Sequence, residues 1–282
     1  MKYRKLEGTD LTVPQYVLGT GDYASNVPAD IARDLLKTYV DCGGTMLDTS
    51  HYYGSFLVGG RSLSECLVGD FLQENHLREQ VLISTKGCCY ATNKPYEKRM
   101  TPAFLRSDLT ESLRNLHTDY IDFYWLHQDD PSQPVGAILE ELNRCVEEGK
   151  IRYFGCSNWK IERILEADAY AEAHGLRKFS ANQVMLNMAY PNMTAVDELI
   201  QTWLTPGMRK YHERTQRPVF AYCSQASGFF YNCFKDDYME NIGYSYSRKY
   251  FYNSESLRRA KQALRLSKQS GMTLQDIVLG YT

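Results

Sequence analysis

Polar and titratable side chains follow a short apolar segment near residue 47 of this 282-residue chain. Thr45-Met46-Leu47 is typical of a buried strand, and the polar stretch from Asp48 to Tyr53 comes directly after it. A carboxylate and a phenol five residues apart can take part in proton transfer if another group adjusts the proton affinity of the phenol. The chemistry of this stretch therefore depends on the side chains that other elements bring to it.

Other apolar segments of the chain also end in polar residues. These residues are Lys86, His127, Ser157, Asn158, Gln183 and Tyr222. Each has an ordinary explanation when taken alone. Lys86 could be a strand-end lysine whose ammonium reaches water, Asn158 could be a helix N-cap, and Tyr53 is one of 22 tyrosines. His127 could be a hydrogen-bonded histidine of the core or of a loop. A functional site is favoured because these residues recur at the same place in successive segments.

The apolar segments alternate with stretches of helical periodicity. The expected strands lie at residues 16–21, 45–47, 80–86, 121–127, 152–156, 180–185 and 218–223. Helices are expected between them, with Pro28, Thr101-Pro102 and Pro134 near their starts. Seven strand-then-helix units with a spacing of about 30 residues predict a parallel sheet.

This pattern predicts an α/β fold of the (β/α)8 TIM-barrel type, in one domain over residues 1–282. An open dinucleotide-binding sheet is less favoured, because the segment from Gly19 to Ala24 lacks the third glycine of that fingerprint. Two helices are expected after the seventh strand, over 247–270 and from 273 to 281. The eighth strand and the last helix of a barrel are missing. We therefore expect a shortened form of a longer chain, with impaired cofactor affinity.

Composition excludes several other classes of protein. The formal net charge is -2 and no basic tract occurs, which argues against nucleic-acid binding. No stretch has the apolar length of a membrane span, and the N-terminus lacks the apolar segment of a signal peptide. The eight cysteines include no C-x-x-C spacing, so we expect reduced thiols, no metal site and a cytoplasmic location.

Four stretches resemble the aldo-keto reductase family. Leu47–Gly54 is similar to its first signature, Ser84–Gly87 to its lysine strand, and Leu113–His127 to its second signature. Gly149–Asn158 resembles the segment that leads to the nicotinamide contacts. The resemblance runs from about Leu18 to the end of the chain, and these motifs in this order are highly specific.

The resemblance implies a catalytic role for four residues. Tyr53 would protonate the substrate carbonyl oxygen, and Lys86 would lower the pKa of that phenol, which is near 10 when unperturbed. Asp48 would hold Lys86 in place, and His127 would orient the carbonyl. His51 is not the catalytic histidine in this assignment. No partner is assigned to Thr49, Ser50, His51 or Tyr52.

The resemblance also implies a nicotinamide cofactor, NADPH, with NADH left open. The residues expected to bind it are Gly19, Thr20, Asp48, Ser157, Asn158, Gln183, Tyr222, Cys223, Ser224, Gln225 and Ser227. Amide and hydroxyl side chains suit the nicotinamide carboxamide, and Tyr222 would stack on its ring. The loop after Tyr222 would take the pyrophosphate. The family residues that contact the adenosine 2'-phosphate lie after the eighth strand, so the preference for NADPH rests on the resemblance alone.

The expected reaction is the reduction of an aldehyde or ketone, such as a small or sugar-derived carbonyl compound, to an alcohol. One alternative is an NADPH-binding regulatory or scaffold subunit of the same fold. Another is a barrel enzyme of unrelated chemistry, but the metal or Schiff-base residues that it requires are not evident. Five residues are expected, by position only, to line the substrate pocket: Tyr23, Cys88, Cys89, Trp159 and Phe229. Oligomeric state is not predicted.

Overall fold

The computed structural model describes residues 1–55, 57, 60–90, 99–195 and 201–282. The chain divides into two compact units, which are considered separately below. Unit 1 consists of Met1–Asn182 and Tyr211–Pro218, and unit 2 of Gln183–Lys210 and Val219–Thr282. The chain passes between the two units three times, so neither is a simple N- or C-terminal half.

Unit 1 begins with a hairpin that the sequence pattern did not indicate. Strands β1 (Tyr3–Lys5) and β2 (Thr12–Pro14) pair in antiparallel fashion, with Tyr3 opposite Pro14. All three residues of β1 are exposed, so the alternation of buried and exposed positions that marks a longer strand is absent from it.

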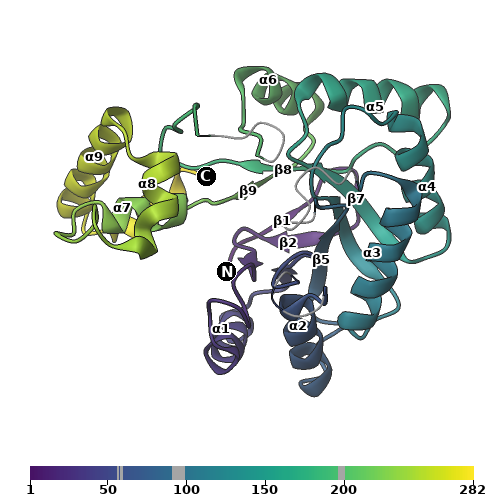
Figure 1. Ribbon diagram of the computed structural model, residues 1–282, viewed down its shortest axis with the longest axis horizontal. Coiled ribbons are helices and arrows are strands. Elements are labelled where there is room, and N and C mark those ends of the chain that lie inside the picture. Colours follow the sequence, from purple (N-terminus) through teal and green to yellow (C-terminus); the bar gives the residue numbers. More distant parts are fainter. Residues whose placement is uncertain (56, 58–59, 91–98, 196–200) are drawn as a thin grey trace. The chain divides into compact units, whose positions relative to one another are not determined.

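A parallel sheet forms the centre of unit 1 (Figure 1). Its strands are neighbours in chain order: β3 (Leu18–Gly19), β4 (Met46–Asp48), β5 (Leu82–Gly87), β6 (Ile121–Leu126) and β7 (Ile151–Ser157). The helices that alternate with them are α1 (Ala29–Asp41), α2 (Leu63–Glu74), α3 (Pro102–Asn115), α4 (Val135–Glu147) and α5 (Ile161–Ala173). The predicted alternation and the parallel α/β class are confirmed.

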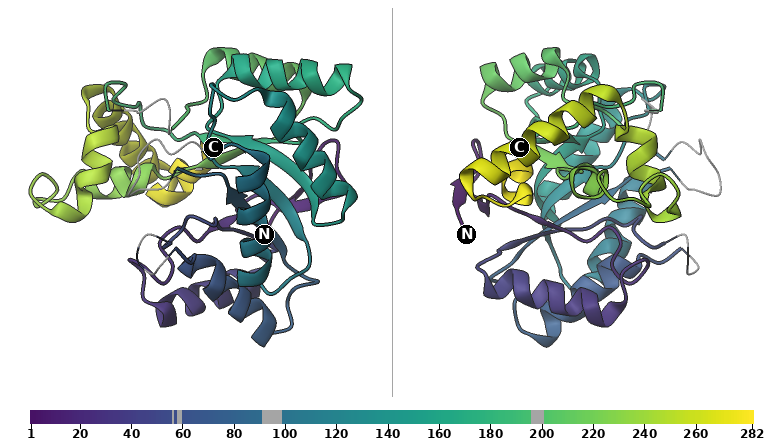
Figure 2. Two further views of the ribbon diagram at one scale, coloured as in Figure 1. Left: turned by 45° about the vertical axis from the view of Figure 1, so that its right-hand side comes forward. Right: turned by 90° about the vertical axis from the view of Figure 1, so that its left-hand side faces the viewer.

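The helices cover the outer face of this curved sheet, as Figures 1 and 2 show. Every residue of β6 is buried, as expected of a parallel strand that packs on both faces. The start of α3 is confirmed in detail, because the Thr101 hydroxyl accepts the Phe104 N–H and Pro102 takes the first helical position. Ser62 caps α2 in the same way through the Glu65 N–H. These caps fix the residue at which each of the two helices begins.

Unit 2 contains most of β8 (Asn182–Met185), the neighbouring strand β9 (Val219–Tyr222) and a group of helices. Helix α6 (Pro206–Thr215) starts in unit 2 and ends in unit 1. After β9 come α7 (Phe229–Asn232), α8 (Ser245–Phe251), α9 (Ser254–Ser270) and α10 (Leu274–Gly280), with short 3-10 turns at Ala226–Gly228 and Ile242–Tyr244. Within the described residues no strand follows β9.

The core of unit 2 is aromatic. It is built around Phe229, Phe230, Tyr238 and Phe251, with small residues such as Ala260 between them. The prediction of one continuous helix over 247–270 is wrong. Asn253 interrupts it, because its side chain accepts the Ser256 N–H and caps a new helix.

Candidate functional site

The C-terminal ends of the parallel strands bring the predicted catalytic residues to one edge of the sheet in unit 1. Asp48 ends β4 and pairs in register with Ser84 of β5, while Lys86 of β5 pairs with Trp125 of β6. His127 directly follows β6. In parallel α/β folds this edge is where active sites form.

Lys86 is the most deeply buried charge of the site, with an exposed fraction of 2%. Its ammonium donates to the Asp48 carboxylate at 2.6 Å and to the Thr49 carbonyl at 2.7 Å. Burial by itself lowers the pKa of Lys86, but the nearby Asp48 carboxylate and the Tyr53 hydroxyl raise it above its ordinary value. Lys86 is therefore a cation at neutral pH.

A buried hydrogen-bonded chain fixes the Asp48 carboxylate from the other side. The Ser84 hydroxyl donates to the second Asp48 oxygen at 2.7 Å and accepts the indole N–H of Trp125 at 2.7 Å. The sequence argument missed both residues. Strand alternation could have indicated Ser84, because it lies two residues before Lys86 and so faces the same side of β5.

Tyr53 brings its ring beside the lysine, with the Lys86 ammonium 4.9 Å from the ring centre. Burial raises the pKa of Tyr53, and Asp48 raises it further, while Lys86 lowers it. The effect of Lys86 has the expected sign, but the net shift of the phenol pKa is upward, because burial is the largest effect. Tyr53 is therefore protonated at neutral pH and can act as a proton donor.

His127 lies edge-on to Tyr53, with ring centres 5.9 Å apart and an interplanar angle of 86°. Burial, together with the positive charge of Lys86 and the proximity of His51, lowers the pKa of His127 to about 3. The ring is therefore neutral at physiological pH. Its Nδ1 lies 3.0 Å from the Ser50 hydroxyl, and its backbone carbonyl accepts the Asn158 amide N–H at 3.0 Å.

Three residues without an assigned partner prove to have one. The Thr49 carbonyl holds Lys86, Ser50 contacts His127, and His51 Nε2 lies 2.9 Å from a carboxylate oxygen of Glu111. The partners are separated by 37 to 77 residues in the chain, so no local sequence pattern could have indicated them. The structure leaves His127, and not His51, beside Tyr53.

Among the predicted cofactor residues of unit 1, Gly19 ends β3 and Thr20 is buried. The Thr20 hydroxyl bonds to Ser64 and to the Asp48 carbonyl, so it ties strand ends together. Asn158 donates to the Ser157 hydroxyl at 3.2 Å and has a left-handed backbone with φ of 60°. The alternative that Asn158 caps α5 is wrong, because Lys160 occupies the N-cap position.

The remaining predicted cofactor residues lie in unit 2. Gln183 is buried in β8, and Tyr222 ends β9. Ser224 and Gln225 continue the chain into a tight turn whose backbone is left-handed at Cys223, Ala226 and Ser227, with φ between 50° and 55°. Strained backbone of this kind at non-glycine residues is concentrated at functional sites.

Two of the five expected pocket-lining residues are fully buried in cores. Trp159 has an exposed fraction of 0% in unit 1 and donates its indole N–H to the Gln128 carbonyl. Phe229 has an exposed fraction of 0% in the core of unit 2. Both therefore pack as core residues. Tyr23 and Cys88 are also buried, and Cys89 is half-buried.

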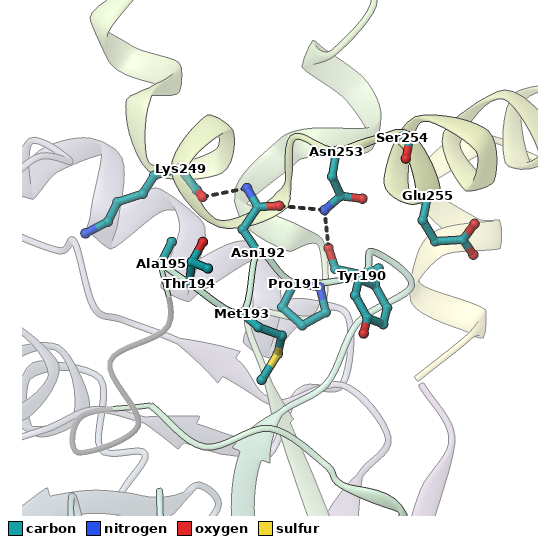
Figure 3. A pocket seen from close by; sticks show the side chains of 10 residues that line it. All are labelled: Tyr190, Pro191, Asn192, Met193, Thr194, Ala195, Lys249, Asn253, Ser254 and Glu255. Atoms are coloured by element: carbon teal, nitrogen blue, oxygen red, sulfur yellow. Dashed lines mark hydrogen bonds between the residues drawn. The ribbon is translucent and has the colours of Figure 1, made fainter.

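An open hollow of about 480 Å³ occurs in unit 2, between residues 190–195 and the segment 249–255 (Figure 3). Its two amide side chains bond to each other and to the backbone. Asn253 donates to Asn192 and to the Tyr190 carbonyl, and Asn192 donates to the Lys249 carbonyl, each at 2.8 Å. The predicted catalytic residues do not line this hollow.

The described residues contain no cluster of His, Cys, Asp or Glu side chains arranged to hold a metal ion. All eight cysteines lie in the described segments and are free thiols. Across those same segments, no helix combines the length and the apolar character needed to cross a membrane.

Comparison with known proteins identifies the family of the chain. The sequence model of the aldo/keto reductase family matches residues 16–282. An aldo-keto reductase from Bacillus subtilis is 29% identical over 181 residues, which cover 63% of this chain and 53% of that protein. Norsolorinic acid reductase from Aspergillus flavus is 30% identical, covering 59% and 42% of the two chains. An aryl-alcohol dehydrogenase from Pestalotiopsis microspora is also 30% identical, covering 55% and 40%. The matches span about half the length of these relatives or less.

Proposed function

The chain belongs to the aldo/keto reductase family, and from that premise we propose that it reduces an aldehyde or ketone to an alcohol with NADPH as the hydride source. The arrangement of Lys86, Asp48 and Tyr53 carries this proposal. A buried ammonium that a carboxylate holds at 2.6 Å lies beside a protonated phenol. A phenol in this setting can give up a proton, because the adjacent positive charge stabilises the phenolate that remains.

Each residue has one role in the proposed reaction. Tyr53 donates its hydroxyl proton to the substrate oxygen as that oxygen becomes an alkoxide. Lys86 stabilises the resulting phenolate, and Asp48 keeps the ammonium charged and in place. His127 is neutral, so it contributes a hydrogen bond to the substrate rather than a charge.

The donor groups present suit a nicotinamide nucleotide. When bound, NADPH supplies the hydride. In unit 1, Ser157 and Asn158 offer the hydroxyl and amide groups that suit its carboxamide, because that group needs both donors and acceptors. In unit 2, Tyr222 offers an aromatic ring for stacking, and the strained turn over residues 223–227 offers backbone N–H groups and hydroxyls that suit a pyrophosphate. The choice of NADPH over NADH belongs to the proposal.

The substrate belongs to the proposal too. Two relatives are named for an aryl alcohol and for norsolorinic acid, and oxidation of an aryl alcohol gives an aryl carbonyl compound. We therefore place aryl aldehydes and aryl ketones first in a substrate panel, ahead of sugar-derived aldehydes.

The test is the oxidation of NADPH and of NADH with this carbonyl panel, by the wild-type protein and by Tyr53→Phe. We expect the variant to lose about 10²- to 10⁴-fold in turnover, as is typical for removal of a general acid, while NADPH binding stays nearly unchanged. Tyr16→Phe is the matched control, because Tyr16 is exposed and its turnover should equal that of the wild type.

Unchanged turnover in Tyr53→Phe would overturn the mechanism. A wild-type protein that binds NADPH but reduces no carbonyl compound would overturn the enzymatic proposal in favour of a regulatory subunit.

A further inference from the structure

Ser50 is fully buried between β4 and Tyr53, with its hydroxyl 3.0 Å from Nδ1 of His127. Among the described residues this is the one hydrogen bond of the His127 side chain, since the bond to Asn158 is made by the backbone carbonyl of His127. Among the described residues, the second ring nitrogen, Nε2, therefore has no hydrogen-bond partner. The orientation and the tautomer of this ring therefore depend on whether the Ser50 hydroxyl donates its proton to Nδ1 or accepts one from it.

The Ser50 oxygen has three polar neighbours but only one proton to give. It accepts the backbone N–H of Tyr52 at 3.2 Å. Its proton can then go either to His127 Nδ1 at 3.0 Å or to the Lys86 carbonyl at 3.4 Å. The shorter distance favours His127.

The Lys86 carbonyl is also the poorer acceptor, because it already accepts the His51 backbone N–H at 3.0 Å. An unprotonated Nδ1, in contrast, has no other donor among the described residues, and a buried acceptor without a donor is costly. Donation from Ser50 to Nδ1 thus satisfies both groups. The ring is neutral, so its single proton must then lie on Nε2.

We propose that Ser50 is a positioning residue that holds His127 in the Nε2–H tautomer, so that Nε2–H donates to the substrate carbonyl oxygen. This proposal rests on the proposed carbonyl reduction for its consequence, but not for the tautomer itself. With Nε2–H and the Tyr53 hydroxyl both donating, the oxygen receives two hydrogen bonds before the proton is transferred. The opposite tautomer would present a lone pair to the substrate oxygen and repel it.

The tautomer can be measured directly. In protein labelled with ¹⁵N-histidine, the two ring nitrogens of a neutral histidine give distinct signals for the protonated and the bare atom. His127→Asn identifies which of the six histidines gives the signal of interest. We expect wild-type His127 to be protonated at Nε2 and bare at Nδ1 at pH 7.

Ser50→Ala tests the cause. We expect a mixed or reversed tautomer signal and a loss of about tenfold in kcat/KM, the size expected for one lost hydrogen bond, with NADPH affinity unchanged. Ser50→Thr keeps the hydroxyl and should restore the Nε2–H signal. Ser55→Ala is the matched control, because the Ser55 hydroxyl bonds to the Tyr52 carbonyl in the same segment and does not touch His127.

A wild-type spectrum with the proton on Nδ1 would overturn the proposal, and so would a Ser50→Ala variant with an unchanged tautomer and unchanged kcat/KM. If Ser50→Ala does not fold, the wild-type spectrum alone still decides the tautomer. If the wild-type protein reduces no carbonyl compound, the proposed function fails. In that case, the comparison of the ¹⁵N spectra of wild type and Ser50→Ala still shows whether Ser50 determines the tautomer of His127.

Discussion

The ammonium of Lys86 lies 2.6 Å from a carboxylate oxygen of Asp48, and the two side chains have exposed fractions of only 2% and 14%. Removing two charges from water is costly, and the mutual attraction of the pair offsets that cost only while both partners are present. The Ser84 hydroxyl on the second Asp48 oxygen holds the carboxylate in the required orientation. The same Lys86–Asp48 pair therefore affects the stability of unit 1 and keeps the Lys86 ammonium charged, as the proposed role of Tyr53 requires.

Asp48→Asn leaves the Lys86 ammonium buried without its counter-charge. We expect the free energy of unfolding to fall by about 3–5 kcal/mol, the usual cost of breaking a buried pair. Urea unfolding monitored by circular dichroism measures this change. The control is Asp41→Asn in the exposed Lys37–Asp41 pair, where the change should stay within about 0.5 kcal/mol. Equal effects at the two sites would mean that burial of the Lys86 pair contributes nothing.

Ser84→Ala removes the hydroxyl that joins Asp48 to Trp125. We expect a loss of about 1–3 kcal/mol in stability, because the Trp125 indole N–H loses its acceptor in a buried place. In the double variant Ser84→Ala/Trp125→Leu that donor is gone too, so the two losses should not add. A double-mutant cycle by urea unfolding gives the coupling. Strict additivity would show that the hydrogen bond between the two side chains has no energetic role.

Gly87 is required at the end of β5 because Tyr124 lies against it. A Cβ at position 87 would clash with the Tyr124 hydroxyl oxygen. The Tyr124 hydroxyl oxygen is buried and makes no hydrogen bond to the described residues, so no hydrogen bond of this hydroxyl contributes to stability. We expect Gly87→Ala to cost about 1–3 kcal/mol through overpacking.

Tyr124→Phe alone should change stability by less than about 1 kcal/mol, since it removes a hydroxyl without a partner. Added to Gly87→Ala, it should recover part of the loss, because the closest contact disappears. Thermal unfolding of the two single variants and the double variant measures this recovery. A double variant that is no more stable than Gly87→Ala would contradict the steric explanation.

The sequence was sufficient for the features that depend on local pattern. Runs such as Ile121–Leu126 and caps such as Thr101-Pro102 are local, and the structure places them as predicted. The end positions of strands followed from the same pattern, and with them the position of Lys86 and His127. The β1–β2 hairpin was missed because its strands have only three residues each and every residue of β1 is exposed. The break between α8 and α9 was missed because a single capping asparagine decides it.

The partners within the site could not be predicted from the sequence. Periodicity shows which face of a strand a residue is on, but not which side chain of another strand it touches. Ser50 and His127 are 77 residues apart, and Trp125 and Ser84 are 41 apart. Their contacts depend on strand register and on side-chain rotamers, which only the packed structure determines. The net direction of the Tyr53 pKa shift depends on burial in the same way.

The low pKa of His127 predicts a specific dependence of stability on pH. An unfolded histidine has a pKa of about 6.5, whereas burial and the charge of Lys86 lower the pKa of folded His127 to about 3. Between these two values the unfolded chain binds a proton that the folded chain does not. Stability therefore rises with pH across this window, and it is lost as pH falls from about 6.5 towards 3.

The comparison of wild type with His127→Asn isolates this contribution. His212, whose pKa burial also lowers, acts in the same direction but is present in both proteins. We expect the wild-type free energy of unfolding to fall more steeply between pH 7 and pH 5 than that of the variant. One proton accounts for at most about 1.4 kcal/mol per pH unit of extra slope. Parallel curves for the two proteins would show that His127 has an ordinary pKa in the folded state, and that burial and Lys86 do not lower it.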